Sequence, residues 1–273
     1  MFETDGIPSS WITKINQFDE LWVPTEWGRS VFIKSGVKED KLRVFGEPIN
    51  TTHYNPSVEQ SVDLFFCIEK GNNSHLPSFL ISCNLNYNKG SILIPSILLK
   101  EKKEKSKVPY FFFLSIFKFE ERKGYKTLLT AFVSAFRGYK GKRVVLFIRS
   151  SFDLVVRRIV VDYLRKEFGN DLDSPDFPTI VFISSSLKYG DLPYFYKAAD
   201  AFVLPTRGEG FGLPLAEAMS MEIPVIATNW SGNTAFMHED NSFPIKVDKF
   251  MRAKIENHNW AHASLSHLVE IMK

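Results

Sequence analysis

The stretch from Ala199 to Thr228 reads ADAFVLPTRGEGFGLPLAEAMSMEIPVIAT, and its pattern decides the fold. An apolar run that ends near Leu204 leads into a glycine-rich turn. A helix is predicted to begin near Pro214, because proline suits the first helical turn, where its missing N–H has no role. Gly210 and Gly212 allow a ligand to approach the backbone closely. Ligands of open α/β sheets bind at the carboxyl ends of strands, so this turn is predicted to form part of a ligand site.

The same alternation of apolar runs and amphipathic segments extends over residues 108–273. Short apolar runs without strict alternation indicate strands that are buried on both faces, and intervening helices indicate parallel pairing. We therefore predict a doubly wound, Rossmann-like α/β domain. The predicted strands are Tyr110–Phe117, Arg143–Ile148, Thr179–Ile183, Ala201–Leu204 and Pro224–Ala227, and the predicted helices are Thr127–Phe136, Leu154–Phe168, Leu192–Ala199 and Leu213–Met219.

Two carboxylates border the glycine-rich turn. Glu209 and Glu217 are eight residues apart, which would place them about 80° apart around one continuous helix, so a shared helix face does not explain the pair. With Glu209 in the loop and Glu217 in the first helical turn, both side chains can border one crevice, while the amides between them face a phosphate. Carboxylates accept hydrogen bonds from sugar hydroxyls. The turn therefore predicts a ligand that carries both sugar and phosphate groups.

A second cluster of charged residues follows the predicted strand at Tyr110–Phe117, in the sequence FKFEERKG. Lys118, Arg122 and Lys123 lie there, at another strand end of the same sheet. A helix N-terminus and one or two lysines can neutralise a leaving nucleoside diphosphate without a metal ion. No carboxylate pair in the sequence is typical of a magnesium site. Such cations are ordinarily exposed at the surface, and for Arg122 we keep that interpretation.

The composition excludes several classes of protein. The 273 residues are 44% hydrophobic and 24% charged, which is ordinary globular usage and argues against global disorder. The net charge of +3 is too small to predict a polyanion-binding surface, and we expect no nucleic-acid partner. Cys67 and Cys83 indicate neither a zinc site nor a disulfide framework. No apolar run reaches the ~18 residues that span a bilayer, and a cytoplasmic location is the default expectation.

The first 107 residues divide into two parts. Residues 1–56 read as the closing part of a unit, with a short strand at Leu21–Val23, a helix at Gly28–Ser35 that Gly36 ends, and a turn-rich linker from Pro48 to Pro56. Residues 57–107 are predicted to be an irregular insertion. Their lysine-rich end also contains glutamates, so a solvated linker is favoured over a nucleic-acid patch.

Taken together, these motifs resemble the retaining nucleotide-sugar glycosyltransferases of family 4, whose GT-B fold pairs two Rossmann-like domains. The signature of that family is two Glu separated by seven residues, which stands here as EGFGLPLAE from Glu209 to Glu217. The segment SIFKFEERKG is similar to the family's donor-phosphate segment, and NQFDELWVPTEWGRSVFIKSGV is similar to the end of its acceptor domain. The resemblance covers residues 1–56 and 108–273.

The resemblance implies roles for individual residues. Glu209 is implied to be the catalytic residue that contacts the donor sugar, Glu217 to bind the ribose hydroxyls, and Lys123 to neutralise the diphosphate. Lys118 occupies a position where many members of the family carry Arg, which keeps the charge but loses the bidentate fork. No metal and no cofactor other than the donor substrate is implied. The backbone amides implied to contact the sugar and the diphosphate are those of Gly210, Phe211, Gly212 and Leu213.

The function implied is transfer of a sugar from a UDP- or GDP-sugar donor to an acceptor hydroxyl, with retention of configuration. The acceptor is expected to be a glycan, a lipid or a small molecule. Because residues 1–56 correspond to only the end of an acceptor domain, the chain reads as truncated, and a partner that supplies the missing acceptor half is also expected. The alternative is a non-catalytic protein that binds a nucleotide-sugar or a partner. A glycosidase ranks third, since it has no need of the cationic cluster.

Overall fold

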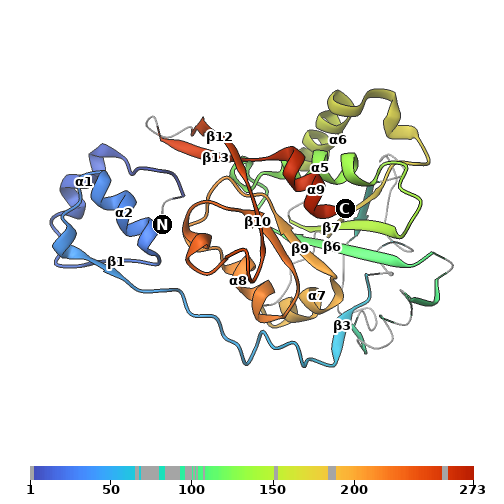
Figure 1. Cartoon of the computed structure of the whole chain (residues 1–273), viewed down its shortest axis with the longest axis horizontal. Helices are drawn as coiled ribbons and strands as arrows, with labels where there is room; N and C mark the ends of the chain where they lie inside the picture. The colour runs from blue at the N-terminus through green and yellow to red at the C-terminus, as the bar shows by residue number, and fades with distance from the viewer. Residues whose placement is uncertain are drawn as a thin grey trace.

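A seven-stranded parallel sheet forms the centre of the molecule in the computed structural model (Figure 1). The structure describes residues 3–64, 68, 80–83, 93–95, 100, 102, 104–106, 108–150, 153–183, 189–253 and 258–273. The strand order is β11-β10-β9-β6-β7-β8-β4, and each adjacent pair is parallel. The strands are β4 (Leu80–Cys83), β6 (Tyr110–Ile116), β7 (Arg143–Arg149), β8 (Thr179–Ile183), β9 (Ala201–Leu204), β10 (Val225–Thr228) and β11 (Phe243–Ile245).

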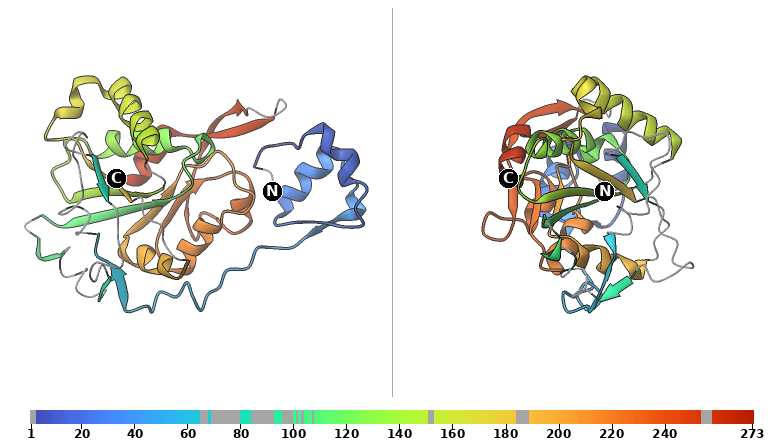
Figure 2. Two further views of the ribbon diagram at one scale, coloured as in Figure 1. Left: turned by 180° about the vertical axis from the view of Figure 1, so that it is seen from behind. Right: turned by 90° about the vertical axis from the view of Figure 1, so that its right-hand side faces the viewer.

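Helices cover both faces of this sheet (Figure 2). One face carries α5 (Tyr125–Phe136), α6 (Leu154–Phe168) and α9 (Leu265–Met272), and the other carries α7 (Leu192–Ala198) and α8 (Leu213–Ser220). The strands consist of apolar residues without strict alternation because both of their faces are buried. Aromatic side chains fill much of the core, where Phe112, Phe147, Phe182 and Phe202 are fully buried. The prediction of a doubly wound α/β fold is confirmed.

The N-terminal unit, residues 3–45, packs around a small core of its own that contains Ile7, Val23, Val37 and Leu42. Its two strands pair in parallel, and Gly36 adopts a φ of +105° after the second helix, which fits the predicted helix stop. An extended segment then runs beneath the sheet to β3 (Figures 1 and 2). The elements of the unit are α1 (Ser9–Ile15), β1 (Leu21–Val23), α2 (Glu26–Lys34), η1 (Glu39–Lys41) and β2 (Leu42–Val44).

Several smaller elements complete the chain. In the described part of the chain, two antiparallel pairs lie outside the main sheet, and one of them, β12–β13, projects toward the N-terminal unit (Figure 1). The pairs are β3 (Gln60–Val62) with β5 (Leu93–Pro95), and β12 (Val247–Arg252) with β13 (Asn259–Ala263). Short 3-10 turns are η3 (Glu121–Lys123), η4 (Gly169–Asp173), η5 (Tyr189–Asp191) and η6 (Gly232–Ala235).

The segment predicted as an irregular insertion contributes a strand to the main sheet. Within residues 57–107, β4 pairs in parallel with β8, with Leu80 opposite Ile180. This strand has only four residues, and without adjacent helical periodicity the sequence gives no sign that it belongs to the sheet. Most of the rest of the predicted insertion lies outside the described residues.

The cysteines differ from expectation. Cys83, at the end of β4, is disulfide-bonded, whereas the sequence indicates no disulfide. A disulfide depends on how the fold places the cysteines, which their positions along the chain do not reveal. Among the helices that the structure describes, none is long and apolar enough to cross a membrane.

Candidate active site

The loops that follow β6 and β9 meet at the point where the strand order reverses. From β6 the chain proceeds outward to β7 and β8, and it then returns to β9 on the other side of β6 and continues to β10. Ligands of doubly wound sheets bind at such switch points. The two loops touch directly, since Arg207 N donates a 2.7 Å hydrogen bond to Arg122 O. Gly124 has a φ of +70°, and a Cβ there would lie 1.9 Å from Pro205 O.

A buried ion pair joins these two loops. Lys123 Nζ donates to Oε1 of Glu209 at 2.7 Å and to Oε2 at 2.9 Å. The side chains retain 10% and 6% of their exposed area, respectively. A pair this buried is stable only when both charges are satisfied. The structure therefore brings together Glu209 and Lys123, the residues that the resemblance implies to contact the donor sugar and to neutralise the diphosphate.

Arg122 belongs to the same cluster, so its interpretation as a surface cation was wrong. Its side chain is only 16% exposed. Nη1 donates to Gly208 O at 2.8 Å and lies 3.6 Å from Oε2 of Glu209, and Nη2 lies 3.3 Å from Oε1 of Glu3. Arginine offers five donors in a rigid fork, which lets one side chain hold several acceptors. The sequence could have indicated that Arg122 belongs to the site, because this residue is adjacent to Lys123.

Lys118, which the resemblance places among the donor-binding residues, contacts a neighbouring carboxylate. Its side chain is 82% exposed and its Nζ lies 2.8 Å from Oε1 of Glu120. Glu120 also lies 3.5 Å from Arg122. The hydrogen bond from Lys118 lowers the pKa of Glu120, and the charges of Lys118, Arg122 and Lys123 lower it further against the opposing effect of burial. Lys118 is thus connected to the cluster through a carboxylate rather than directly.

The glycine-rich turn presents unpaired backbone amides. Within the described part of the chain, the amides of Gly210, Phe211, Gly212 and Leu213 have no hydrogen-bond acceptor. Gly212 caps α8 with a φ of +102°, a conformation that favours glycine. Amides at a helix N-terminus, together with the helix dipole, attract anions. The predicted phosphate-binding turn therefore has donors available for a phosphate.

The loop after β10 holds Glu209 in place through its backbone. Ser231 Oγ accepts a 2.8 Å hydrogen bond from Glu209 N, and Gly232 N donates to Glu209 O at 2.9 Å. Ser231 adopts a φ of +76°. Such a conformation is uncommon for a residue other than glycine, and residues that adopt it cluster at functional sites. A Cβ at Gly232 would lie 2.0 Å from Gly210 O. Neither Ser231 nor Gly232 was predicted from the sequence to belong to the site.

Glu217 occupies a separate position, on the second turn of α8 rather than the first. Its Oε2 accepts a 2.7 Å hydrogen bond from the hydroxyl of Tyr196 on α7. The side chain is buried, and it forms no hydrogen bond or ion pair with the described atoms of Glu209 or Lys123. Each carboxylate of the signature therefore has its own hydrogen-bond partner, and their bordering of one crevice stays a prediction.

The N-terminal unit borders the carboxyl edge of the sheet. Besides the Glu3 contact with Arg122, Asp5 accepts two hydrogen bonds from Asn259 in β13, at 2.6 and 2.9 Å. Trp27 of α2 lies edge-on to Trp230, with ring centroids 5.2 Å apart. A Cβ at Gly208 would lie 2.0 Å from Glu3 O. The candidate site is therefore enclosed from the side of the N-terminal unit.

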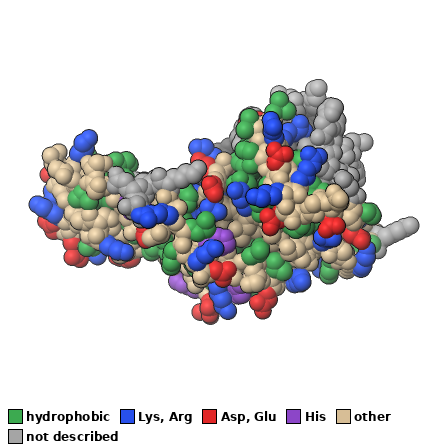
Figure 3. All heavy atoms as spheres, turned by 90° about the horizontal axis from the view of Figure 1, so that it is seen from above, with side chains coloured by type: hydrophobic (Ala, Val, Ile, Leu, Met, Phe, Trp, Pro, Cys, Tyr) green, Lys and Arg blue, Asp and Glu red, His purple; other side chains and the backbone are tan. Residues whose placement is uncertain are grey.

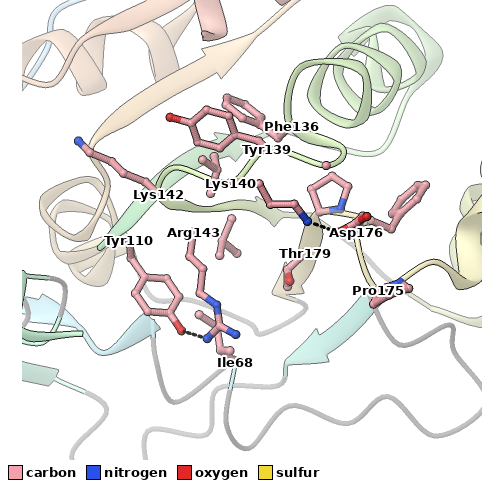
Figure 4. Close-up of a pocket in the computed structure, with 15 residues that line it drawn as sticks. Ile68, Tyr110, Phe136, Tyr139, Lys140, Lys142, Arg143, Pro175, Asp176 and Thr179 are labelled. Atoms are coloured by element: carbon pink, nitrogen blue, oxygen red, sulfur yellow. Dashed lines mark hydrogen bonds and ion pairs between the residues drawn. The ribbon is translucent and has the colours of Figure 1, made fainter. Parts of the chain in front are cut away.

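A separate cavity of about 380 Å³ opens at the opposite edge of the sheet (Figure 4). It is lined by residues at the amino ends of the strands, including Tyr110, Arg143 and Thr179. Lys140 pairs there with Asp176 at 2.6 Å, and Arg143 donates to the hydroxyl of Tyr110 at 2.8 Å. Because this is the amino edge and two of its cations already have partners, we do not assign the active site to it.

The distribution of charged side chains can be compared with what a polyanion or metal site requires. On the face seen from above, positive and negative side chains are interspersed (Figure 3). Among the described residues, no group of three or more His, Cys, Asp or Glu side chains is arranged to hold a metal ion.

Sequence comparisons identify similar proteins. A family model described as "Glycosyl transferases group 1" matches residues 108–257. Over 151 residues the chain is 31% identical to the capsular polysaccharide biosynthesis glycosyltransferase CapM of Staphylococcus aureus, a match that covers 47% of this chain and 38% of that protein. Over 39 residues it is 59% identical to the O-antigen chain mannosyltransferase B of Escherichia coli, covering 14% of this chain and 10% of that protein. The matches thus span well under half of each relative.

Solved structures share the fold. The α,α-trehalose 6-phosphate synthase of Burkholderia multivorans superposes with a TM-score of 0.60 at 13% identity, covering 97% of this chain and 53% of that one. WaaG, a glycosyltransferase involved in lipopolysaccharide biosynthesis, superposes with a TM-score of 0.57 at 16% identity, covering 93% and 52%.

Proposed function

The chain belongs to the group 1 glycosyl transferases, and we propose that it transfers a sugar from a nucleoside-diphosphate donor to an acceptor hydroxyl with retention of configuration. The observation that carries this proposal is the juxtaposition of the Lys123–Glu209 ion pair with the unpaired amides from Gly210 to Leu213. A cation and four amide donors at a switch point suit a diphosphate. A carboxylate beside them suits a sugar hydroxyl.

In this proposal the diphosphate competes with Glu209 for Lys123. When the donor binds, the Lys123 ammonium turns toward the diphosphate, and the amides of Gly210 to Leu213 share in neutralising it. Glu209 is then free to accept hydrogen bonds from the donor sugar, while Arg122, 3.6 Å from Oε2, still balances its charge. Glu217 is proposed to bind the ribose. These assignments follow the family 4 pattern of two Glu separated by seven residues.

In this reaction the protein stabilises the leaving diphosphate. The bond between the anomeric carbon and the diphosphate oxygen breaks through an oxocarbenium-like transition state, the acceptor oxygen takes its place on the same face, and the acceptor's hydroxyl proton passes to the departing diphosphate oxygen. Charge accumulates on the diphosphate as this bond breaks. Donors that already point at that position stabilise it without reorganisation, and Lys123 with the turn amides would supply them without a metal ion.

The donor and the acceptor are proposed by class. UDP- and GDP-sugars remain the two candidate donors. The relatives are named for an O-antigen chain and a capsular polysaccharide, so we propose a glycan as the acceptor. Residues 108–273 are proposed as the donor-binding domain and residues 1–56 as part of an acceptor domain. The site would lie where the N-terminal unit meets the sheet.

The test is release of nucleoside diphosphate from a panel of UDP- and GDP-sugars, with and without glycan acceptors. We expect release with one nucleotide series, and a product whose new glycosidic bond keeps the anomeric configuration of the donor when assigned by NMR. An inverted product would contradict the retaining mechanism. Nucleotide binding without release from any donor would favour the non-catalytic alternative instead.

A further inference from the structure

Tyr196 is placed so that its hydroxyl fixes the carboxylate of Glu217. The hydroxyl donates to Oε2 of Glu217 at 2.7 Å and lies 3.3 Å from Pro214 O. Among the described residues, it provides the only hydrogen bond to this carboxylate. A carboxylate has two oxygens and about four lone-pair sites, so the second oxygen, Oε1, stays available to a ligand.

The position of the Tyr196 ring is set by packing on several sides. Its side chain is fully buried, with Tyr54 edge-on at 6.0 Å and Phe202 of β9 at 5.8 Å between ring centroids. Buried rings that interdigitate in this way occupy single rotamers. The hydroxyl therefore holds a fixed point from which Glu217 is oriented.

The linker fastens together the two helices that carry this pair. Ser220 at the end of α8 donates to Tyr54 O at 2.7 Å, and Lys197 of α7 donates to Pro56 O. Tyr54 packs on the Tyr196 ring from the same side. The segment that leads from the N-terminal unit to the sheet thus supports both Tyr196 and Glu217.

The electrostatic environment keeps the Tyr196 hydroxyl protonated. Burial raises its pKa well above the ordinary value, and the charge and hydrogen bond of Glu217 raise it further, while Arg149 at the end of β7 opposes the shift. A protonated phenol is a donor at every pH where the protein would be expected to work. The hydrogen bond to Glu217 is therefore present throughout that range.

We infer that Tyr196 is a positioning residue that presents the Glu217 carboxylate to the ribose hydroxyls of the donor nucleotide. The inference rests on the proposed function, because it takes the ribose as the ligand of Glu217. Removing the Tyr196 hydroxyl leaves the carboxylate in place but free to rotate. The consequence is lost affinity for the ribose and for no other part of the nucleotide.

The test compares nucleotides that have or lack ribose hydroxyls. Affinities of UDP, GDP and their 2′,3′-dideoxy analogues are measured by calorimetry for the wild type and for Tyr196→Phe. In the wild type, removal of the ribose hydroxyls should weaken binding about 10-fold or more, as expected for hydrogen bonds to a charged group. Tyr196→Phe should weaken the binding of the parent nucleotide by a similar factor and leave the affinity for the dideoxy analogue unchanged.

A matched control is Tyr163→Phe. The Tyr163 hydroxyl is bonded to Thr130 Oγ1 at 2.5 Å between α6 and α5, on the other face of the sheet. This variant should bind all four nucleotides as the wild type does. If Tyr196→Phe weakens the binding of the parent and the dideoxy nucleotides equally, or weakens the binding of neither, the positioning role is overturned. If the wild type binds no nucleotide, the proposed function fails, and this inference fails with it.

A second measurement keeps the hydroxyl and does not depend on the folding of the variant. With 3-fluorotyrosine at position 196, the ¹⁹F resonance should shift when the parent nucleotide binds, and should shift much less with the dideoxy analogue. Equal shifts with both ligands would overturn the inference.

Discussion

Lys123 and Glu209 are separated by 86 residues in the sequence, and their side chains meet at 2.7 Å beside the switch point of the sheet. The pair joins the loop after β6 to the loop after β9. Because both side chains are almost fully buried, each charge depends on the other for compensation. In the proposed reaction this dependence becomes a competition, in which the diphosphate of the donor takes Lys123 away from Glu209.

The first prediction concerns Glu209→Gln. Glutamine removes the carboxylate that competes for Lys123, so UDP or GDP should bind as tightly as in the wild type or more tightly. Sugar transfer should fall about 10²- to 10³-fold, the loss typical of a group that stabilises the transition state. Calorimetry and initial rates measure the two effects. Glu270→Gln, an exposed position on α9, is the control, and transfer by Glu209→Gln within a few-fold of that control would contradict the assignment.

The second prediction concerns Arg122→Lys. A lysine keeps the charge but cannot donate to Gly208 O while also reaching Glu3 and Glu209, because it lacks the planar fork. We expect transfer to fall about 10-fold, since hydrogen bonds to charged groups contribute on this scale. Arg137→Lys serves as the control, because its pair with Asp171 is solvent-exposed and such pairs contribute little. Equal transfer rates in the two variants would show that the contacts of Arg122 contribute no more to transfer than those of an exposed arginine.

The third prediction separates a steric clash from backbone strain. Gly124 and Gly138 have nearly equal φ values, +70° and +68°, but a Cβ at Gly124 would meet Pro205 O at 1.9 Å, whereas a Cβ at Gly138 meets nothing within 4 Å. Gly138→Ala should lower the free energy of unfolding by about 1 to 2 kcal/mol, the cost of a left-handed conformation. Gly124→Ala should cost clearly more in denaturant unfolding. Equal losses would show that the two loops are not in the contact described.

The fourth prediction concerns alkaline pH. The pKa of Tyr196 is raised in the folded state by burial and by Glu217, so the folded protein holds this proton more tightly than the unfolded chain. The resulting stability is fully present below the unfolded value of about 10 and declines as the pH rises above it. Tyr196→Phe should flatten this decline in unfolding curves recorded between about pH 9 and 11. The control is Tyr139→Phe, at an exposed position. If the free energy of unfolding of Tyr196→Phe falls with pH as steeply as that of the wild type, the raised pKa of Tyr196 is refuted.

The sequence predicted those parts of the fold that depend on local periodicity. The strand Thr179–Ile183 and the helix Leu154–Phe168 match the structure at both ends, because continuous apolar runs and amphipathic segments are local signals. The same reasoning could not find β4, whose four residues join the sheet only through pairing with β8. The disulfide of Cys83 was missed for a similar reason.

The candidate site divides in the same way. Glu209, Lys123 and the turn amides follow from motif and position, and the structure places them together. Arg122 and Tyr196 do not follow, because their importance lies in contacts between elements that are distant in the sequence. The shared crevice predicted for Glu209 and Glu217 stays a prediction, and the structure adds the separate partners of the two carboxylates, Lys123 and Tyr196.

In the proposed reaction, Lys123 exchanges Glu209 for the diphosphate of a nucleotide-sugar donor. The most direct measurement is calorimetric titration of the wild type and of Lys123→Met with UDP and with GDP. We expect the wild type to bind one nucleotide, and Lys123→Met, shown to be folded by circular dichroism, to bind it at least about 100-fold more weakly, as expected for loss of a charged contact to a phosphate. Equal affinity in the two proteins would contradict this exchange.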